Sequence, residues 1–494
     1  MNDQASIDID GVIVPTGHLI GGQRVWNAET NGEANGGYEV ISPIDTSALG
    51  VIPRGGAAEA TAAVAAAKAA FPAWAALGAQ GRATILDRFT EAIVARITDL
   101  QKVDSYDQGA LLAGRHSDGL PRTALNIKFF SDWALQLTHD DIVGDVVDNS
   151  VRFEPAGPCA LIVPWNAPLM LGTWKIGPAL AAGNTVVVKP PEFAPLSLSL
   201  LGEIAQEAGL PDGVLNILHG TGAEAGDALV NQPDLARISF TGSPATARVI
   251  GKAAVETMTP VSFELGGKSP FIICADADLK AAARTISVQF MNAGQICLAG
   301  TRLLVEESIL DDLIDEVVVA VDKMVVGDPR EKGTRVGPLI HPTHAAKVRT
   351  LVERAIEAGA RPVIGGGPHP QGELYFQPTI LTDVEQDSEI VQTEVFGPVL
   401  TLQTWTDEDA MIEMANDTVY GLAAMVFTTN EAKAERIASQ VVAGTVWTNC
   451  FFVRDLAAPF GGSRESGVGR EGGTWSFDFF CDIKNVAVKR GTFA

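Results

Sequence analysis

Two stretches near the start of the chain place apolar residues at helical spacing. Residues 57–77, AAEATAAVAAAKAAFPAWAAL, are rich in alanine and predict a helix that is interrupted or restarted at Pro72. Residues 84–103, TILDRFTEAIVARITDLQKV, predict a second helix because apolar residues recur at every fourth position from Ile85 to Ile97. The pattern therefore predicts helices ahead of the first strong strand signals.

Short apolar runs alternate with helical stretches from about residue 158 onward. The runs ALIVP and TVVVKP precede the helical LSLLGEIAQEAGL, and VLNIL and ARISFTG follow at βαβ spacing. This texture is typical of a doubly wound parallel sheet. A second βα-rich block runs from near Phe263 to about Cys450 and includes FIICA, TRLLVEE and the helical DDLIDEVVVAVDKM. The Gly-rich loop PFGGSRESGVGREGG and an apolar, aromatic segment follow it.

Composition narrows the class of protein. The 494 residues are 46% hydrophobic and 19% charged, which is enough for a large buried core and excludes a disordered chain. Thirty-six basic and 60 acidic residues give a net charge of −24, so nucleic acids and anionic membranes are not expected partners. Five scattered cysteines, an acidic start and no uncharged apolar run of about 18 residues favour a cytoplasmic protein without disulfides.

Isolated motifs carry little weight in this sequence. Gly220–Ala225 reads G-x-G-x-x-A after a predicted strand. The acidic residue that binds the ribose should follow about 20 positions later, whereas Asp234 lies only 14 positions after Gly220. A tight turn between strand and helix is the favoured interpretation. GGKS at 266–269 lacks the first glycine of a phosphate-binding loop, and the histidines show no metal-ligand spacing. No metal site is expected.

One cysteine stands in a distinctive setting. Residues 289–301, QFMNAGQICLAGT, place Cys297 among small residues and before the strand TRLLV. A buried structural thiol is the common situation for such a cysteine. The alternative is an exposed nucleophile on a loop that an electrophile can approach. Composition alone does not decide between the two.

Six segments in order resemble the aldehyde dehydrogenase superfamily, and the resemblance spans about residues 40–490. The segments are PWNAPL (164–169), KPPE (189–192), FTGS (240–243), FELGGKSP (263–270), NAGQIC (292–297) and EVFGPV (394–399). The later PFGGSRESGVGRE (459–471) also fits. The resemblance implies a Rossmann-type NAD-binding domain, an α/β catalytic domain and a small strand flap for oligomerisation.

The resemblance assigns the catalytic chemistry residue by residue. Cys297 matches the nucleophile that adds to the aldehyde carbonyl, and Asn166 with the cysteine backbone N–H matches the donors to the oxyanion. Glu264 matches the general base that activates water against the thioester, the alternative being a carboxylate at an exposed strand end. Lys175 and Glu471 occupy positions of a proton path around that base.

The cofactor positions also follow from the resemblance. Lys189 and Glu192 match the residues at the adenosine ribose, where a carboxylate favours NAD over NADP. Pro191 replaces the small residue that many members carry, but both functional positions are intact. Further matches fall at the pyrophosphate (Gly242, Ser243), at the nicotinamide end (Glu394, Phe396) and elsewhere along the cofactor (Trp165, Leu265).

The substrate is the least determined feature. LPRTALNIKFF (120–130), VRDLAAPFGG (453–462) and GREGGTWSFDFFCDIKNV (469–486) resemble the branch that oxidises hydroxymuconic and aminomuconic semialdehydes. Arg122 and Arg454 match two arginines that grip the substrate carboxylates in that branch. Solvated or intersubunit arginines are the alternative. Ser463-Arg464 departs from the branch, so neutral or aromatic aldehydes stay open as substrates.

Three functions are compatible with this scaffold. The first is a hydrolytic, NAD-dependent aldehyde dehydrogenase, and the second is a CoA-acylating semialdehyde dehydrogenase, which generally lacks a glutamate at position 264. The third is a catalytically idle protein, which is expected to have lost Cys297 or Asn166.

We expect the chain to divide into an NAD-binding domain (1–130, 153–262), a catalytic domain (263–477) and oligomerisation segments (131–152, 478–494) that give a homodimer or homotetramer.

Overall fold

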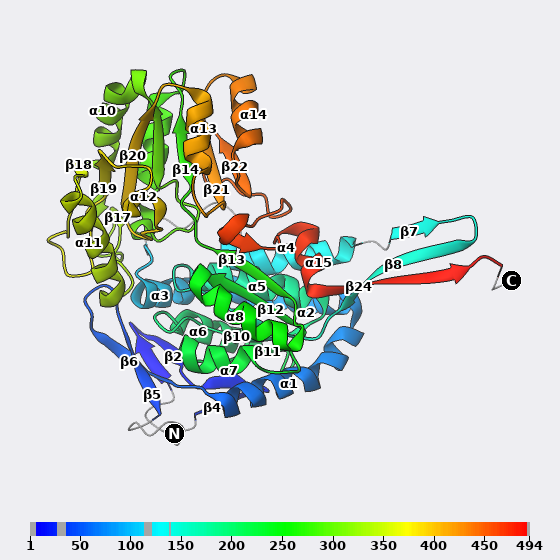
Figure 1. Cartoon of the computed structure of the whole chain (residues 1–494). Helices are drawn as coiled ribbons and strands as arrows, with labels where there is room; N and C mark the ends of the chain where they lie inside the picture. Colours follow the sequence, from blue (N-terminus) through cyan, green and yellow to red (C-terminus); the bar gives the residue numbers. More distant parts are fainter. Residues whose placement is uncertain (1–5, 27–35, 113–120, 138–139, 492–494) are drawn as a thin grey trace.

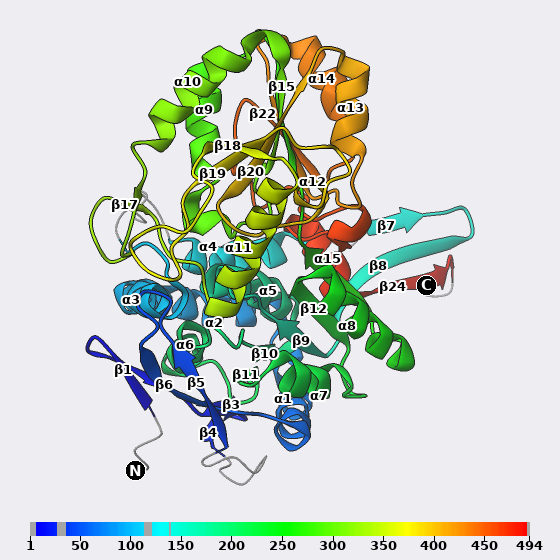
Figure 2. The same ribbon diagram turned by 60° about the vertical axis from the view of Figure 1, so that its left-hand side comes forward.

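The computed structural model describes residues 6–26, 36–112, 121–137 and 140–491, which form two large α/β bodies and a projecting small sheet (Figure 1). The predicted α/β architecture with parallel sheets is confirmed. The two bodies stack on each other, and the small sheet extends away from both in each view (Figures 1 and 2). Within the described ranges no single helix is long and apolar enough to cross a membrane, whereas the bent pair Ala57–Ala76 and Gly78–Ala95 reaches that length and composition together.

An eight-stranded sheet forms the centre of the first body. Its five central strands are parallel, and in their order across the sheet they are β13 (Val261–Leu265), β12 (Arg237–Gly242), β9 (Pro158–Ile162), β10 (Thr185–Lys189) and β11 (Leu215–Ile217). Short antiparallel strands close the two edges: β23 (Gly467–Val468) beside β13, and β3 (His18–Ile20) with β4 (Gln23–Val25) beside β11. Every residue of β9 and β10 is buried, because helices cover both faces of a parallel sheet.

The helices of the first body include α1 (Ala57–Ala76), α2 (Gly78–Ala95), α3 (Ile97–Gln108), α4 (Arg122–Gln136), α5 (Pro168–Ala182), α6 (Leu196–Glu207), α7 (Asp227–Val230) and α8 (Pro244–Thr257). The predicted interruption at Pro72 is wrong, since α1 continues through it and ends beside Gly78, where φ is +67°. Trp74 holds this last turn, because it is buried and its indole N–H donates to the Leu180 carbonyl at 3.1 Å. That packing offsets the cost of an interior proline.

The predicted helix over 84–103 is divided in the structure. It breaks at Arg96, where φ is −105° and ψ is 13°, and α3 begins at the next residue. The Arg96 guanidinium pairs with Asp99 at 2.6 Å and with Glu207 of α6 at 3.3 Å. These ion pairs connect the break to a helix that lies far away in the sequence, which the local pattern does not report.

A seven-stranded sheet forms the second body. Its order is β18 (Arg361–Ile364), β19 (Thr379–Thr382), β20 (Val399–Trp405), β15 (Arg302–Glu306), β14 (Pro270–Ile273), β21 (Ala423–Phe427) and β22 (Thr445–Thr448), and β18 alone runs antiparallel to its neighbour. The helices of this body include α9 (Leu279–Val288), α10 (Leu310–Val321), α11 (Pro342–Glu357), α12 (Glu389–Gln392), α13 (Glu408–Asn416) and α14 (Glu431–Gln440). One apolar cluster packs the sheet against α9–α11, and a second packs its other face against α13 and α14.

The small sheet consists of β7 (Asp140–Val143), β8 (Val147–Pro155) and β24 (Cys481–Lys489), all antiparallel (Figure 1). Two further antiparallel hairpins lie near the N-terminus: β1 (Ser6–Ile9) with β2 (Val12–Pro15), and β5 (Gly37–Ile41) with β6 (Ala48–Pro53).

The structure shifts three of the predicted boundaries. The boundary after residue 262 falls inside β13, which pairs with β12 over its whole length, so the chain leaves the first sheet only after Leu265. Residues 131–136 are the last turns of α4 and lie outside the small sheet. The segment up to residue 477 also returns to the first body, because β23 pairs with β13 and α15 (Gly473–Phe480) packs against α5.

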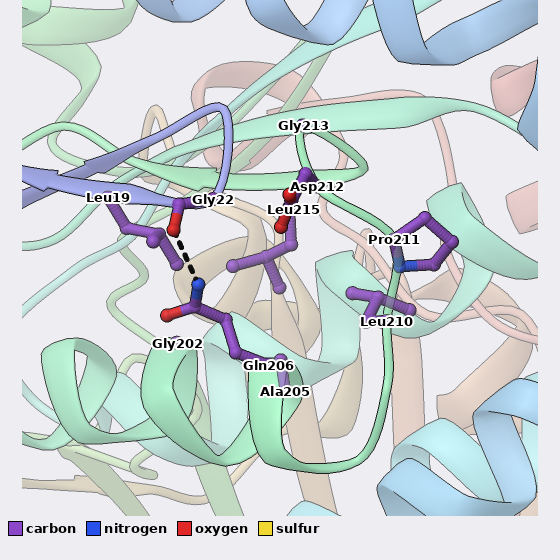
Figure 3. A pocket seen from close by; sticks show the side chains of 10 residues that line it. All are labelled: Leu19, Gly22, Gly202, Ala205, Gln206, Leu210, Pro211, Asp212, Gly213 and Leu215. Atoms are coloured by element: carbon purple, nitrogen blue, oxygen red, sulfur yellow. Dashed lines mark hydrogen bonds between the residues drawn. The ribbon is translucent and has the colours of Figure 1, made fainter.

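A shallow pocket beneath the β3–β4 turn is a packing feature of this hairpin (Figure 3). Gln206 of α6 donates its side-chain amide to the Gly22 carbonyl at 2.8 Å, as the dashed line shows. A Cβ atom at Gly22 would lie 2.0 Å from Oδ1 of Asp212, and φ of Gly22 is +80°. Only glycine fits this close approach, which docks the hairpin on the end of α6.

Candidate active site

A cavity of about 180 Å³ lies where the two bodies meet. The first body contributes the segments that follow β9, β12 and β13, and the second contributes the cysteine loop, α11 and the segment before β20. The carboxyl ends of parallel strands are the usual place for a ligand in such folds. The cavity brings together eight of the predicted site residues: Trp165, Asn166, Gly242, Ser243, Leu265, Cys297, Glu394 and Phe396.

The loop that carries Cys297 is tied to the segment that carries Asn166. Asn292 donates its side-chain amide to the Asn166 carbonyl at 3.0 Å, and Asn166 donates its own to the Gln295 carbonyl at 3.0 Å. The turn is tight, because φ of Asn292 is +54° and a Cβ at Gly294 would lie 2.1 Å from the Gly397 carbonyl oxygen. The loop thus places the thiol and the Asn166 amide at one cavity.

Cys297 is half-buried in this cavity. Burial, reinforced by the charges of Glu394 and Glu264, raises the pKa of its thiol to about 12. The positive charge of Arg454 opposes this rise. A thiol in this environment holds its proton at neutral pH, so the proton must be removed before nucleophilic attack.

Glu264 lies at the end of β13 and is only 4% exposed, so the alternative of an exposed carboxylate is wrong. Within the described ranges neither of its carboxyl oxygens has a hydrogen-bond partner. Burial, and then repulsion by Glu471, holds the pKa of Glu264 well above its usual range. A carboxylate with a raised pKa is a stronger base than an exposed one, which suits proton abstraction.

Lys175 and Glu471 form a buried ion pair next to this carboxyl. Lys175 Nζ lies 2.8 Å from Glu471 Oε1 and donates to the Ser239 hydroxyl at 2.8 Å. The Trp174 indole N–H donates to the second oxygen, Glu471 Oε2, at 2.6 Å. The resemblance gave no role to Trp174 or Ser239.

At one end of the cavity, Glu394 accepts the backbone N–H of Gly267 at 3.0 Å. Burial raises the pKa of Glu394 to about 7. A Cβ at Gly266 would lie 1.9 Å from Glu394 Oε2, so the absence of a side chain there gives the carboxyl its place. The Trp165 and Phe396 rings lie edge to face with centroids 5.2 Å apart.

Two further residues line this end and were missed by the sequence reasoning. His344 Nε2 lies 2.8 Å from the Phe396 carbonyl oxygen, and burial lowers the pKa of its imidazole to about 4, so the ring is neutral and donates. Lys347 lines the cavity one helical turn later. The signal was present in HPTHAAK, where the i, i+3 spacing puts both on one face at the start of α11.

The predicted ribose-binding pair lies at the end of β10. Lys189 is buried, which lowers the pKa of its ammonium to about 8, and its Nζ lies 4.0 Å from Glu192 Oε2. The backbone N–H of Gly222 donates to the same oxygen at 2.8 Å. Gly222 begins a single helical turn after β11, as expected of a tight turn, whereas Asp234 pairs with Lys68 on the surface.

Arg122 and Arg454 both approach the Trp174 ring. Their guanidinium carbons lie 5.4 Å and 4.8 Å from the ring centroid, and Arg454 also lies 3.8 Å from that of Phe460. Burial, and then the charge of Arg454, lowers the pKa of Arg122 to about 10. In the part of the chain that the structure describes, neither arginine has an acidic partner within 4.0 Å, and Arg454 Nη2 is buried without an acceptor. Two such cations form a receptor for an anion.

Gly242 ends β12, and Ser243 caps α8 by accepting the Thr246 backbone N–H at 3.2 Å. A helix of 14 residues therefore begins at the cavity, and its dipole favours a negative charge there. The described residues contain no group of three or more histidine, cysteine, aspartate or glutamate side chains that could hold a metal ion.

Known proteins are similar to this chain over nearly its whole length. The sequence model of the Aldehyde dehydrogenase family matches residues 29–486. The 2-hydroxymuconic semialdehyde dehydrogenase of Pseudomonas sp. (strain CF600) is 40% identical over 96% of this chain and 99% of its own. The 2-aminomuconic semialdehyde dehydrogenase of Danio rerio is 41% identical over 89% of this chain and 92% of its own. The P. syringae indole-3-acetaldehyde dehydrogenase AldA, solved with NAD⁺, superposes with a TM-score of 0.93 at 36% identity, covering 96% of this chain and 97% of its own.

Proposed function

The chain belongs to the aldehyde dehydrogenase family and is an NAD-dependent dehydrogenase, and from this premise we propose the roles of its residues and the class of its substrate. The observation that carries the proposal is the cavity that both Cys297 and Asn166 line, with the buried Glu264 close enough for its charge to act on the Cys297 thiol. Of the three functions compatible with the scaffold, the hydrolytic dehydrogenase agrees best with this arrangement, because all three groups are present.

The residues fit the cofactor. Gly242 and Gly266 line the cavity at positions where an added Cβ would meet the Phe240 ring and the Glu394 carboxyl, and the α8 N-terminus suits a pyrophosphate. The Glu192 carboxylate suits ribose hydroxyls and repels a 2′-phosphate. Bound NAD supplies the hydride acceptor of the reaction.

The protein's own groups carry the covalent steps. Cys297 Sγ loses its proton to water and adds to the aldehyde carbon. The Asn166 side-chain amide and the Cys297 backbone N–H donate to the carbonyl oxygen as it becomes an oxyanion. Loss of a hydride from the resulting hemithioacetal leaves a thioester on Cys297. Glu264, whose raised pKa suits it to receive a proton, then removes one from the water that attacks the thioester and passes it to the departing thiolate, which releases the acid and the free thiol.

The preferred substrate is a semialdehyde that carries a carboxylate. Arg122 and Arg454 support this assignment, because Arg454 Nη2 is buried without an acceptor in the described structure and the Arg122 guanidinium, whose Nε donates to Asn126 Oδ1 at 2.7 Å, keeps its other N–H groups for a carboxylate. They also supply local positive charge to a chain of net charge −24, which otherwise repels an anionic substrate. The relatives named for muconic semialdehydes agree with this class.

One assay tests the proposed function. The enzyme is incubated with NAD and either 2-hydroxymuconic semialdehyde or benzaldehyde, with and without CoA, and NADH absorbance is followed. We expect turnover without CoA, a preference for the acidic aldehyde, and none with the Cys297→Ala variant, which retains NAD binding. A strict need for CoA identifies an acylating enzyme, and equal use of both aldehydes identifies a general aldehyde dehydrogenase.

We also propose that the small sheet joins subunits into a homodimer or homotetramer. Ile142 and Ile483 on its strands are 59% and 55% exposed, and a projecting sheet with apolar residues is an aggregation-prone edge unless another chain covers it. Analytical ultracentrifugation of the full chain tests this, and a monomer at working concentration contradicts it.

A further inference from the structure

Trp174 contacts both of the proposed substrate arginines. It lies on α5 and is only 3% exposed, with the guanidinium carbons of Arg122 and Arg454 at 5.4 Å and 4.8 Å from its ring centroid. Two guanidinium groups that face the same ring repel each other, and the charge of Arg454 indeed adds to burial in lowering the pKa of Arg122. Attraction between cations and the aromatic ring offsets part of this repulsion, in addition to the bond that Arg122 Nε donates to Asn126 Oδ1 at 2.7 Å and the contact of Arg454 with Phe460.

The same indole contacts the acid–base side of the site. Its N–H donates to Glu471 Oε2 at 2.6 Å, while Lys175 holds Glu471 Oε1 at 2.8 Å. The backbone of Glu471 exchanges two hydrogen bonds of 2.7 Å with Phe460, whose ring covers Arg454. Trp174 therefore touches both arginines and the carboxylate whose charge acts on Glu264.

We propose that Trp174 is a positioning residue with two separable roles: its ring holds Arg122 and Arg454 in place for the substrate carboxylate, and its N–H holds Glu471 beside Glu264. The first role rests on the proposed function, since it presumes an anionic substrate. The second does not depend on the substrate, because it concerns hydrolysis of any thioester on Cys297. One buried side chain thus positions both the arginines that bind the substrate and the carboxylate that acts on the general base.

Two variants separate the roles. Trp174→Phe retains a ring beneath the arginines and removes only the N–H donor. Trp174→Leu removes both, and Trp174→Met provides a second variant without a ring in case the leucine variant does not fold. NAD binding, measured by NADH fluorescence and by the protection that NAD gives against thermal unfolding, establishes that each variant is folded.

We expect the ring to determine KM for the acidic aldehyde. In Trp174→Leu, KM for 2-hydroxymuconic semialdehyde should rise about tenfold, because the arginines lose their support, while KM for benzaldehyde should change less than about threefold. In Trp174→Phe, both KM values should stay within about threefold of wild type. An acidic-to-neutral KM ratio in the leucine variant equal to that of wild type overturns the role of the ring.

We expect the N–H to determine the pH dependence of hydrolysis. Without this donor the negative charge of Glu471 is less compensated, and its repulsion of Glu264 increases. The pH midpoint of acyl-enzyme hydrolysis, measured with benzaldehyde after the NADH burst, should therefore move upward by about half a unit in both Trp174→Phe and Trp174→Leu. An unchanged midpoint overturns the role of the N–H.

Trp405→Phe is the matched control. Trp405 is also buried and donates its indole N–H, to the Leu304 carbonyl at 3.1 Å, but it lies in the core of the second body. It should move neither readout. If wild type does not favour the acidic aldehyde, the proposed substrate class fails, and the pH midpoint with benzaldehyde still decides the second role of Trp174.

Discussion

A Cβ atom at Gly461 would lie 2.6 Å from Oε1 of Glu264, so the carboxyl of the proposed general base rests against a position that only glycine can occupy. Gly461 also has φ of +152°, which an L side chain rarely adopts. Gly461, more than 190 positions away in the sequence, therefore limits the space that the Glu264 side chain can occupy.

The first prediction follows from this contact. Gly461→Ala should displace the Glu264 carboxyl and slow hydrolysis of the thioester, so kcat should fall by about tenfold or more, which corresponds to ~1.4 kcal/mol. The NADH burst should be retained, because it precedes hydrolysis. Gly333→Ala is the control, since Gly333 has a positive φ of +97° but no atom within 4 Å of an added Cβ. Equal losses in both variants would show that backbone strain alone is responsible.

The second prediction concerns the role of Glu264 in turnover. Glu264→Gln has nearly the same volume but cannot take a proton, so we expect one burst of NADH per active site and then almost no steady-state rate. Rapid-mixing absorbance measurements resolve the burst. A steady rate like that of wild type, without a burst, would remove Glu264 from the hydrolytic step.

The third prediction concerns stability. Burial, and then repulsion by Glu471, holds the pKa of Glu264 well above its usual range, so the folded protein keeps this proton where the unfolded chain has lost it. The free energy of unfolding therefore falls as pH rises through that range. Glu264→Gln has no proton to lose, so its Tm should rise relative to wild type as the pH rises above the ordinary glutamate pKa of about 4.3. A Tm difference independent of pH would contradict this prediction.

Contiguous motifs were the part of the site that the sequence predicted well. The segments around Asn166 and Cys297 each contain the functional residue together with the neighbours that position it, and both residues line one cavity in the structure. Trp174 and His344 were missed because their importance comes from partners such as Glu471 and Phe396, which lie 52 to 297 positions away. Their residue types alone suggest only packing.

The fold shows the same division between local and distant causes. Alternating strands and helices predicted the parallel sheets, because the apolar period is a local property. The continuity of α1 through Pro72 depends on the packing of Trp74 against α5, about 100 positions later. Likewise β13 joins the first sheet through its pairing with β12, which no pattern within the β13 segment itself reveals.

The fourth prediction concerns the choice between NAD and NADP. Glu192 Oε2 is held by the Gly222 N–H at 2.8 Å and by Lys189 at 4.0 Å, which leaves the other oxygen for ribose hydroxyls. Glu192→Ser removes the carboxylate, so we expect weaker NAD binding and a smaller ratio of kcat/KM for NAD to that for NADP. Steady-state kinetics with both cofactors measure this ratio, and equal kcat/KM values in the wild-type enzyme would refute the ribose assignment.

The fifth prediction tests the substrate class through Arg454. Its guanidinium lies 3.8 Å from the Phe460 ring centroid, and Nη2 is buried without an acceptor in the described structure, so a substrate carboxylate can complete its hydrogen bonds. A charge-assisted hydrogen bond contributes roughly 1.5–3 kcal/mol. Arg454→Ala should therefore raise KM for an acidic semialdehyde about tenfold or more and leave KM for a neutral aromatic aldehyde nearly unchanged.

The two substrates serve as controls for each other, because general damage to the site slows both. Arg454 also lies close enough to Cys297 to lower the pKa of its thiol, so a modest common decrease in kcat is expected with either aldehyde. The decisive quantity is the ratio of kcat/KM values for the acidic and the neutral aldehyde. If Arg454→Ala leaves that ratio unchanged, the two arginines do not select a carboxylate, and the substrate must be sought among neutral aldehydes.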